Sequence, residues 1–156
     1  MVSGMLSNIG DFKYKVKDKD SKFVSSLEVY KLNKSHFQGE TKDNLRQGVG
    51  KQVWDDGTTF EGTYKNDAAN GNGRMIQSDG NVFEGTFNNN IAMGKGKFTS
   101  NFGDSYTGNF IDNLPNGPGE LINAQGDKYN GEFLNGKRSG QGKVEMSTSQ
   151  LYEGQF

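Results

Sequence analysis

The sequence predicts an all-β protein, an elongated single-layer antiparallel sheet of stacked 23-residue β-hairpins. Three observations predict it: an aromatic residue recurs every 23 residues, glycines follow it at fixed distances, and turn-forming residues recur between them. The composition agrees, because 31% hydrophobic residues cannot build a thick core, whereas 11 Phe, 6 Tyr and 1 Trp can supply a thin apolar strip. A formal net charge of −1 with 12% aromatic residues argues against disorder.

The recurring aromatic defines position 1 of each repeat, and glycine always follows it at position 3. A second aromatic stands at position 5 except at Thr41, and complete repeats carry glycines at positions 12 and 14. We predict structural roles for the glycines of the regular repeats, because a ring at position 1 can cover bare backbone. These are Gly62, Gly71, Gly73, Gly85, Gly94, Gly96, Gly108, Gly117, Gly119, Gly131, Gly140 and Gly142.

Two kinds of turn are expected in each repeat. Positions 7 and 8 hold Asn, Asp or Gly, which tolerate positive φ and favour a two-residue type I′ turn. A regular ladder from that turn would place position 1 opposite 14 and position 3 opposite 12. At the other end, a three-residue loop over positions 19–21 with glycine at 21 keeps all rings on one face.

The second loop sets the register between repeats. It places position 16 beside the next position 1, and position 15 opposite the next position 2. The latter pairs carry opposite charges: Lys51 with Glu61, Arg74 with Glu84, and Lys143 with Glu153. Two strands per repeat should advance the sheet by about 10 Å.

The domain boundaries follow the period. The array is expected over 37–156, in repeats 37–59, 60–82, 83–105, 106–128, 129–151 and a partial 152–156. Residues 1–36 are interpreted as a flexible segment with a degenerate capping unit, whose residues 12–17 alternate as a strand would. A helix carrying Phe23, Leu27 and Tyr30 on one stripe is the alternative. The partial last repeat predicts an open sheet edge that pairs with a partner, with another copy or with further repeats.

The pattern aromatic-x-Gly-x-aromatic, then Gly-x-Gly, then often Asp-Gly resembles the MORN (membrane occupation and recognition nexus) repeat. The resemblance covers about 120 of the 156 residues and implies a MORN-repeat solenoid. Thr41 replaces an aromatic, and Thr148-Ser149 replaces Asp-Gly. We expect those two repeats to be less regular.

Catalytic and metal chemistry is not expected. The chain has no cysteine, and His36 is its single histidine. Gly48-Val49-Gly50-Lys51 lacks the Lys-Ser/Thr ending of a phosphate-binding loop, and the acids are scattered without metal-ligand spacing. The sequence therefore predicts neither an enzyme nor a cofactor or metal site.

The leading hypothesis is a non-catalytic scaffold that binds a helical or loop segment of a partner protein along the aromatic face. The candidate contact residues are Phe60, Tyr64, Phe83, Phe87, Tyr106, Phe110, Tyr129, Phe133 and Tyr152. Residues 37–156 carry eleven basic and fifteen acidic side chains, which argues against nucleic acid. The MORN resemblance implies a cytoplasmic protein in a cytoskeletal, ciliary or membrane-apposed assembly, and the sheet ends allow homo-oligomers.

Two alternatives stay open. One is a phosphoinositide or membrane-surface module in which Lys13, Lys15 and Lys17 contact acidic lipid. The other is a regulatory repeat region of a larger enzyme. The sequence leaves the partner, the organelle and the oligomeric state undetermined.

Overall fold

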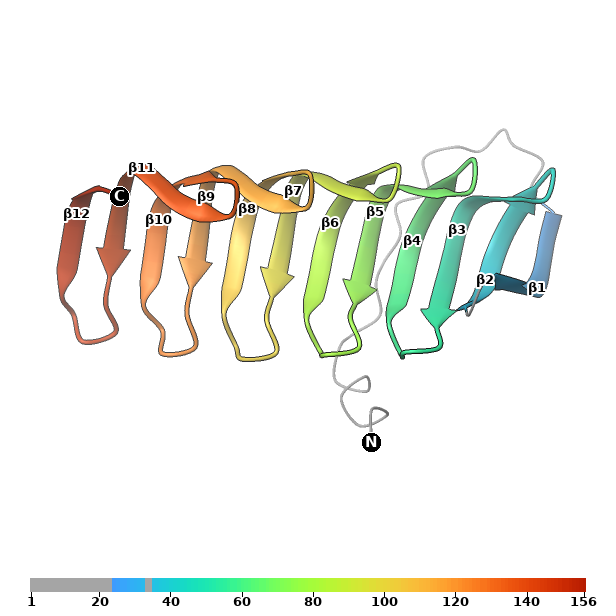
Figure 1. The fold of residues 1–156 in the computed structure, drawn as a ribbon, viewed down its shortest axis with the longest axis horizontal. Coiled ribbons are helices and arrows are strands. Elements are labelled where there is room, and N and C mark those ends of the chain that lie inside the picture. Colours follow the sequence, from blue (N-terminus) through green and yellow to red (C-terminus); the bar gives the residue numbers. More distant parts are fainter. Residues whose placement is uncertain (1–23, 33–34) are drawn as a thin grey trace. The chain divides into compact units, whose positions relative to one another are not determined.

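The computed structural model describes residues 24–32 and 35–156, and the regular elements within this part of the chain are all strands. The described residues form two compact units, the first from those up to residue 80 and from 87–90, the second from residues 81–86 and 91–156. Each unit is a single layer of antiparallel strands (Figure 1). Because strands in such a sheet pack mainly against their neighbours in the chain, no single core spans the array. The all-β hairpin fold predicted from the sequence is confirmed.

In the first unit the strands lie side by side in chain order. They are β1 (Val24–Leu32), β2 (Ser35–Lys42), β3 (Leu45–Trp54), β4 (Thr59–Lys65) and β5 (Ala68–Ile76). β6 (Val82–Asn88) contributes its last two residues to this unit and residues 82–86 to the second.

The second unit continues the same hairpin pattern, again in chain order. Its further strands are β7 (Ile91–Thr99), β8 (Ser105–Ile111), β9 (Leu114–Ile122), β10 (Lys128–Leu134), β11 (Lys137–Glu145) and β12 (Leu151–Gln155).

The two-residue turns at positions 7 and 8 are confirmed. Both residues of each turn have positive φ, for example 47° and 71° at Asn66 and Asp67, and 49° and 67° at Asp112 and Asn113. Asn and Asp reach this left-handed region at low cost, and the type I′ turn matches the twist of the strands that it joins. The sequence therefore fixes where each hairpin closes.

The ladder predicted beyond that turn is wrong by two residues. The pairs nearest the turn are as expected, as at Tyr64 with Ala69, but Gly62 pairs with Gly73, which sets position 3 opposite 14. Position 1 consequently lies opposite 16, as Phe60 does with Met75. The reason is a β-bulge at the position-12 glycine, which in this repeat has a φ of 96° and adds residues to one strand only.

The three-residue loops at positions 19–21 are confirmed. Gly57 at position 21 has a φ of 90°, and its N–H donates to the carbonyl oxygen of Trp54 at 3.0 Å. Ser149 takes the same place in the repeat that lacks this glycine, with a φ of 69°. The irregularity expected at Thr148-Ser149 is thus limited to a non-glycine residue in a strained conformation.

The register between repeats is also confirmed for the pairs that lie within one unit. Position 16 faces the next position 1, for example Phe98 and Tyr106. On the other face Lys51 is paired with Glu61, and their charged atoms are 2.7 Å apart. Lys143 is the cross-strand neighbour of Glu153, although its nearest carboxylate, at 2.8 Å, is that of Glu145.

At the N-terminal side, Val24–Leu32 is a strand paired with β2, not the helix that the spacing of Phe23, Leu27 and Tyr30 allows. The strand expected over residues 12–17 lies outside the described residues, as do the proposed lipid-contacting residues Lys13, Lys15 and Lys17.

Candidate functional site

One face of each unit carries the aromatic rings, and we call it the ring face. A position-1 ring contacts the position-5 ring of its own repeat and that of the next, edge to face. In the second unit Tyr106 lies 5.2 Å from Phe110 and 4.8 Å from Phe133, measured between ring centroids. In the first unit Phe60 lies 5.4 Å from Tyr64 and 5.0 Å from Phe87. Such pairs add about 0.5–1.5 kcal/mol each beyond the area they bury.

The rings are buried, which corrects the expectation of an exposed aromatic strip. Seven of the nine candidate contact residues have at most 5% of their surface exposed. These seven are Phe60, Tyr64, Phe87, Tyr106, Phe110, Tyr129 and Phe133. Phe83 is half-buried, and Tyr152 is 52% exposed. The buried rings interlock above the glycines and form the core, so a partner meets chiefly the side chains beside them.

The glycines at positions 3 and 14 form the floor under each ring. A Cβ added at Gly73 would lie 2.5 Å from the Phe60 ring, and one added at Gly119 would lie 2.5 Å from the Tyr106 ring. Real side chains do not approach so closely, so only glycine lets the ring lie flat on the backbone. This arrangement supplies an apolar core to a single-layer sheet.

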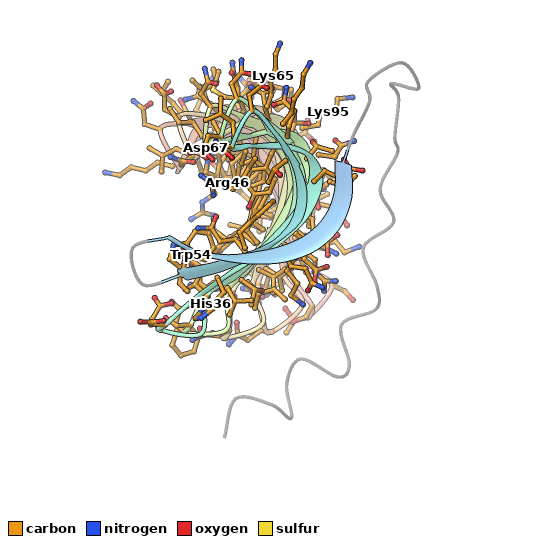
Figure 2. The ribbon with its side chains drawn as sticks, turned by 90° about the vertical axis from the view of Figure 1, so that its right-hand side faces the viewer. His36, Arg46, Trp54, Lys65, Asp67 and Lys95 are labelled. Atoms are coloured by element: carbon orange, nitrogen blue, oxygen red, sulfur yellow. The ribbon has the colours of Figure 1, made fainter. Side chains whose placement is uncertain are left out.

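The accessible part of the ring face is the row at position 16. Phe98, Leu121 and Val144 are half-buried and pack against the rings of the second unit. Met75 holds the same position in the first unit and is half-buried, and so is Trp54, two positions along at position 18. Figure 2 shows Trp54 on the concave side of the curved strands. The sequence predicted that this row lies beside the rings. It did not predict that the row is the accessible part of the face, because the rings themselves were expected to be exposed.

A polar network interrupts the ring face of the first unit. The Arg46 guanidinium lies 5.0 Å from the Tyr64 ring centroid, and its Nε donates to Asp67 Oδ1 at 2.7 Å. Arg46 Nη1 donates to Gln52 Oε1 at 2.6 Å, and Gln52 Nε2 donates to Ser35 Oγ at 2.9 Å. The hydrogen bond from Arg46 lowers the pKa of Asp67. Both Gln52 and Ser35 are buried, so the network ties β2, β3 and the next turn together.

A second arginine lies on the ring face of the second unit. Arg138 lies 5.5 Å from the Tyr129 ring centroid and 5.3 Å from that of Phe156. Position 10, which both arginines occupy, is Ala69, Ala92 or Pro115 in the other repeats. Cation–π contact accounts for both placements. Arg138 is exposed, whereas the Arg46 side chain is only 15% exposed and ion-paired.

Each unit has a hollow on its ring face beside its arginine. In the first unit a cavity of about 230 Å³ is lined by Arg46, Gln52, Trp54, Phe60, Tyr64, Ala69, Met75, Phe87 and Asn90. In the second unit a more open one of about 470 Å³ is lined by Leu121, Phe133, Gly136, Lys137, Arg138 and Phe156. Both combine apolar walls with a guanidinium, which suits single side chains of a polypeptide.

Side-chain hydrogen bonds join successive turns, a feature that the sequence pattern did not predict. Asn113 Oδ1, at position 8, accepts from the backbone N–H of Ala92 at 2.8 Å, and Asn90 does the same for Ala69. At the opposite edge, Asp104 Oδ1 accepts from the N–H of Ala124 at 2.8 Å. Asn or Asp recurs at positions 8 and 22 and could have indicated these bonds. Turn formation alone explains position 8 in the sequence, and position 22 was given no role.

His36 and the Gly48–Lys51 segment, the other residues considered for catalysis or phosphate binding, lie in ordinary structural positions. His36 is exposed, and Gly48 forms the bulge with a φ of 75°, so the Gly48–Lys51 segment is a bulged strand. Within the described residues no three His, Cys, Asp or Glu side chains come together in a way that would hold a metal ion. The same part of the chain contains no helix capable of spanning a membrane.

These features define a class of protein, a β-hairpin repeat array. The same ring-on-glycine packing recurs in its repeats, while the accessible side chains differ from repeat to repeat. The MORN repeat family model matches residues 37–59, 60–82, 83–104, 106–128 and 129–145, and the chain belongs to this family. MORN repeats are generally non-enzymatic modules for protein or membrane interaction. The comparison with curated proteins found no match.

Proposed function

We propose that the chain is a non-catalytic scaffold that binds a segment of a partner protein along the ring face. The observation that carries this proposal is the position-16 row. Its half-buried members differ between repeats, although all of them cover the same ring arrangement: Met75, Phe98, Leu121 and Val144. Gln52, which holds this position in the first repeat, is buried in the Arg46 network. Variable apolar side chains on a constant framework are the usual basis of recognition by repeat proteins.

The hollows next to the row supply anchoring points. In the first unit the hollow has Trp54 and Met75 on its walls, and Arg46 and Asn90 supply polar groups. An apolar side chain of the partner fills such a site, while its main-chain oxygens accept from the arginine. By analogy with the family, we place this scaffold in the cytoplasm, in a cytoskeletal, ciliary or membrane-apposed assembly.

The test uses neighbouring residues of one strand. Leu121 lies on the ring face and Glu120 lies on the opposite face of β9, because successive strand residues alternate. A photo-cross-linking amino acid is placed at one or the other position, and the protein is irradiated in a native cell extract. We expect position 121 to form a discrete adduct with one partner segment, identified by mass spectrometry.

The same adduct from position 120, or adducts with lipid alone from position 121, would contradict the proposal. Circular dichroism of both variants provides the folding control. Substituting the rings themselves would be a poor test, because Phe87 and Phe110 are only 4% and 3% exposed and hold the sheet together.

A further inference from the structure

A row of exposed aliphatic side chains lies along the two-residue turns of the second unit. We call it the turn-edge ridge and define it as Ile91, Ile111, Leu114 and Leu134. Their exposed fractions are 37%, 49%, 45% and 56% in that order. All four occupy position 6 or 9, immediately before or after a turn. The corresponding position-6 residue of the first unit, Lys65, projects at the turn edge in Figure 2.

The fold does not require aliphatic residues at these positions. In the first unit Lys42 and Lys65 occupy position 6, and Ala68 follows at position 9 after a turn of the same conformation. Leu45 is the one large aliphatic residue at positions 6 and 9 of the 37–59 and 60–82 repeats, at 41% exposure. Lysine at an exposed position stays solvated, whereas grouped exposed Ile and Leu side chains invite association. The ridge thus has a cost that stability does not explain.

The ridge is held in a fixed geometry. Successive turns are hydrogen-bonded to one another, from Asn113 N–H to the Ala92 carbonyl at 3.1 Å and from Gly136 N–H to the Pro115 carbonyl at 2.9 Å. Leu114 reaches the neighbouring turn, since a Cβ added at Gly136 would lie 3.6 Å from its Cδ2. Rigid elements present contact residues at a lower entropic cost than loops do.

The spacing of the ridge matches an α-helix. Ile111 and Leu114 are cross-strand neighbours, a relation that places side chains about 5 Å apart. Helix residues three or four apart have a similar separation, about 5–6 Å. Equivalent residues of successive repeats are about 10 Å apart, because two strands intervene. Seven residues of α-helix rise about 10.5 Å. Apolar pairs at heptad spacing on a helix therefore recur at nearly the same distance as the repeats.

We infer that the turn-edge ridge binds an amphipathic α-helix of a partner protein whose apolar residues recur at heptad spacing. The helix runs along the row of turns and places one apolar pair on Ile111 and Leu114, with single apolar residues on Ile91 and Leu134. Lys137, the cross-strand neighbour of Leu134, ends the aliphatic row and favours an acidic residue at that end of the helix. This surface is separate from the position-16 row, so the inference does not depend on ring-face binding.

The absence of cysteine from the chain permits a direct test with single labels. An environment-sensitive dye is attached at Lys137→Cys beside the ridge, and at Lys65→Cys, which likewise replaces a lysine next to a two-residue turn, in the first unit. The probes are three synthetic peptides of about 21 residues and equal composition, the length of about three heptads. One carries leucine pairs at heptad spacing, one carries the same leucines scrambled, and one has the heptad pattern interrupted by proline.

We expect saturable binding of the heptad peptide at the Lys137→Cys label and none at the Lys65→Cys label. The pair Ile111→Ser and Leu134→Ser should weaken this binding by roughly tenfold or more, because both contacts lose buried aliphatic area. Leu45→Ser, an exposed residue of the first unit, should leave it unchanged. Leu121→Ser, on the ring face, should also leave it unchanged, which separates this inference from the proposed function.

Equal binding of the scrambled peptide, or no effect of the double serine variant, would overturn the inference. A dye response to unlabelled chain instead of peptide would assign the ridge to self-association. A response only to vesicles containing acidic lipid would assign it to a membrane surface. Circular dichroism checks that each variant folds. The substitutions at the exposed residues Ile111, Leu134 and Leu45 should each cost less than about 0.5 kcal/mol of stability.

Discussion

The two units build the same ring face with different chemistry. In the first, positions 1 are phenylalanine, at Phe37 and Phe60, and polar support comes from Arg46 and its partners. In the second, positions 1 after Phe83 are tyrosine, and each hydroxyl donates to the main-chain carbonyl three residues on. The distance from Tyr129 Oη to the Glu132 oxygen is 2.9 Å.

The difference shows how a repeat supplies hydrogen-bond partners to the main-chain groups at its β-bulge. The bulge takes main-chain groups at positions 4 and 13 out of the regular ladder, and a buried polar group without a partner is costly. The first unit supplies side chains at position 4, where Glu40 Oε2 accepts from the N–H of Val49 at 2.8 Å. The second uses the tyrosine hydroxyl, so one backbone defect is stabilised in two ways.

The largest effect should come from the ring floor that both units share. Gly119→Ala and Gly73→Ala should each cost about 2–4 kcal/mol of unfolding free energy, because the new methyl group collides with a buried ring. Gly119→Ala should cost more, since the Tyr106 ring is also held by its 3.0 Å hydrogen bond to the Asn109 carbonyl. Urea unfolding followed by circular dichroism measures both.

Gly57→Asn is the matched control for these variants. A Cβ at Gly57 would meet nothing within 4 Å, and asparagine tolerates positive φ, so its cost should stay within about 1 kcal/mol. If Gly119→Ala were no more damaging than this control, the close packing of ring on glycine would be wrong.

The Arg46 network can be removed by making the first unit resemble the others. Arg46→Ala alone should cost about 1–2 kcal/mol, because it removes the guanidinium donor of Gln52 and Asp67. These acceptors then keep only hydrogen bonds of 3.3 Å, from the Tyr64 hydroxyl and from the main-chain N–H of residue 46. Adding Asp67→Asn recreates the Ala69–Asn90 arrangement, in which the asparagine accepts from a main-chain N–H at 2.8 Å. The double variant should therefore recover most of the loss.

The single tryptophan makes this measurement specific, since Trp54 lies in the first unit. Its fluorescence in urea follows that unit, while circular dichroism follows the whole chain. A double variant as unstable as Arg46→Ala would show that the arginine stabilises chiefly through the rings and not through Asp67.

Sequence reasoning predicted the parts of the fold that depend on a single residue type. Asn66 and Asp67 mark a turn because few residues tolerate positive φ, and Gly57 marks the loop for the same reason. It failed to predict the ladder register, because a regular ladder and a β-bulge are both compatible with glycine at position 12. The register depends on whether Gly71 pairs across the ladder or forms the bulge. It also predicted exposed rings, because the burial of one ring by the rings of neighbouring repeats depends on the assembled sheet and not on one repeat.

Each tyrosine hydroxyl should contribute less than the arginine network, and the two together make the second unit sensitive to alkali. Burial raises the pKa of Tyr106 and Tyr129 above the ordinary value of 10.0. A raised pKa in the folded state means that stability is complete below about pH 10 and is lost as the pH rises further. Replacing both with phenylalanine should cost about 1 kcal/mol per hydroxyl at pH 7 and remove most of the alkaline decline.

Urea titrations at pH 7 and pH 11 check that expectation, with Tyr152→Phe as the control. Tyr152 is 52% exposed and its hydroxyl lies 3.4 Å from the Gln155 carbonyl, so its loss should change little at either pH. An unchanged alkaline decline in the double phenylalanine variant would locate the sensitivity elsewhere.

The smallest effect should distinguish the units at acid pH. The Arg46 hydrogen bond lowers the pKa of Asp67 below its ordinary value of 3.8. A lowered pKa in the folded state gives stability that is present above about pH 4 and is lost as the pH falls through the folded pKa. The loss should be well under about 1 kcal/mol, because the Asp67 side chain is 45% exposed and water screens the pair.

Trp54 fluorescence at pH 6 and pH 3 measures the acid sensitivity of the first unit, and Asp67→Asn should reduce it. Asp127→Asn is the comparison in the second unit, where the N–H of Ser147 donates to the carboxylate at 2.8 Å and lowers its pKa. That substitution should leave the Trp54 signal unchanged, since Asp127 belongs to the other unit. If both variants changed the signal equally, the two units would unfold together, and the network around Arg46 would stabilise the whole array.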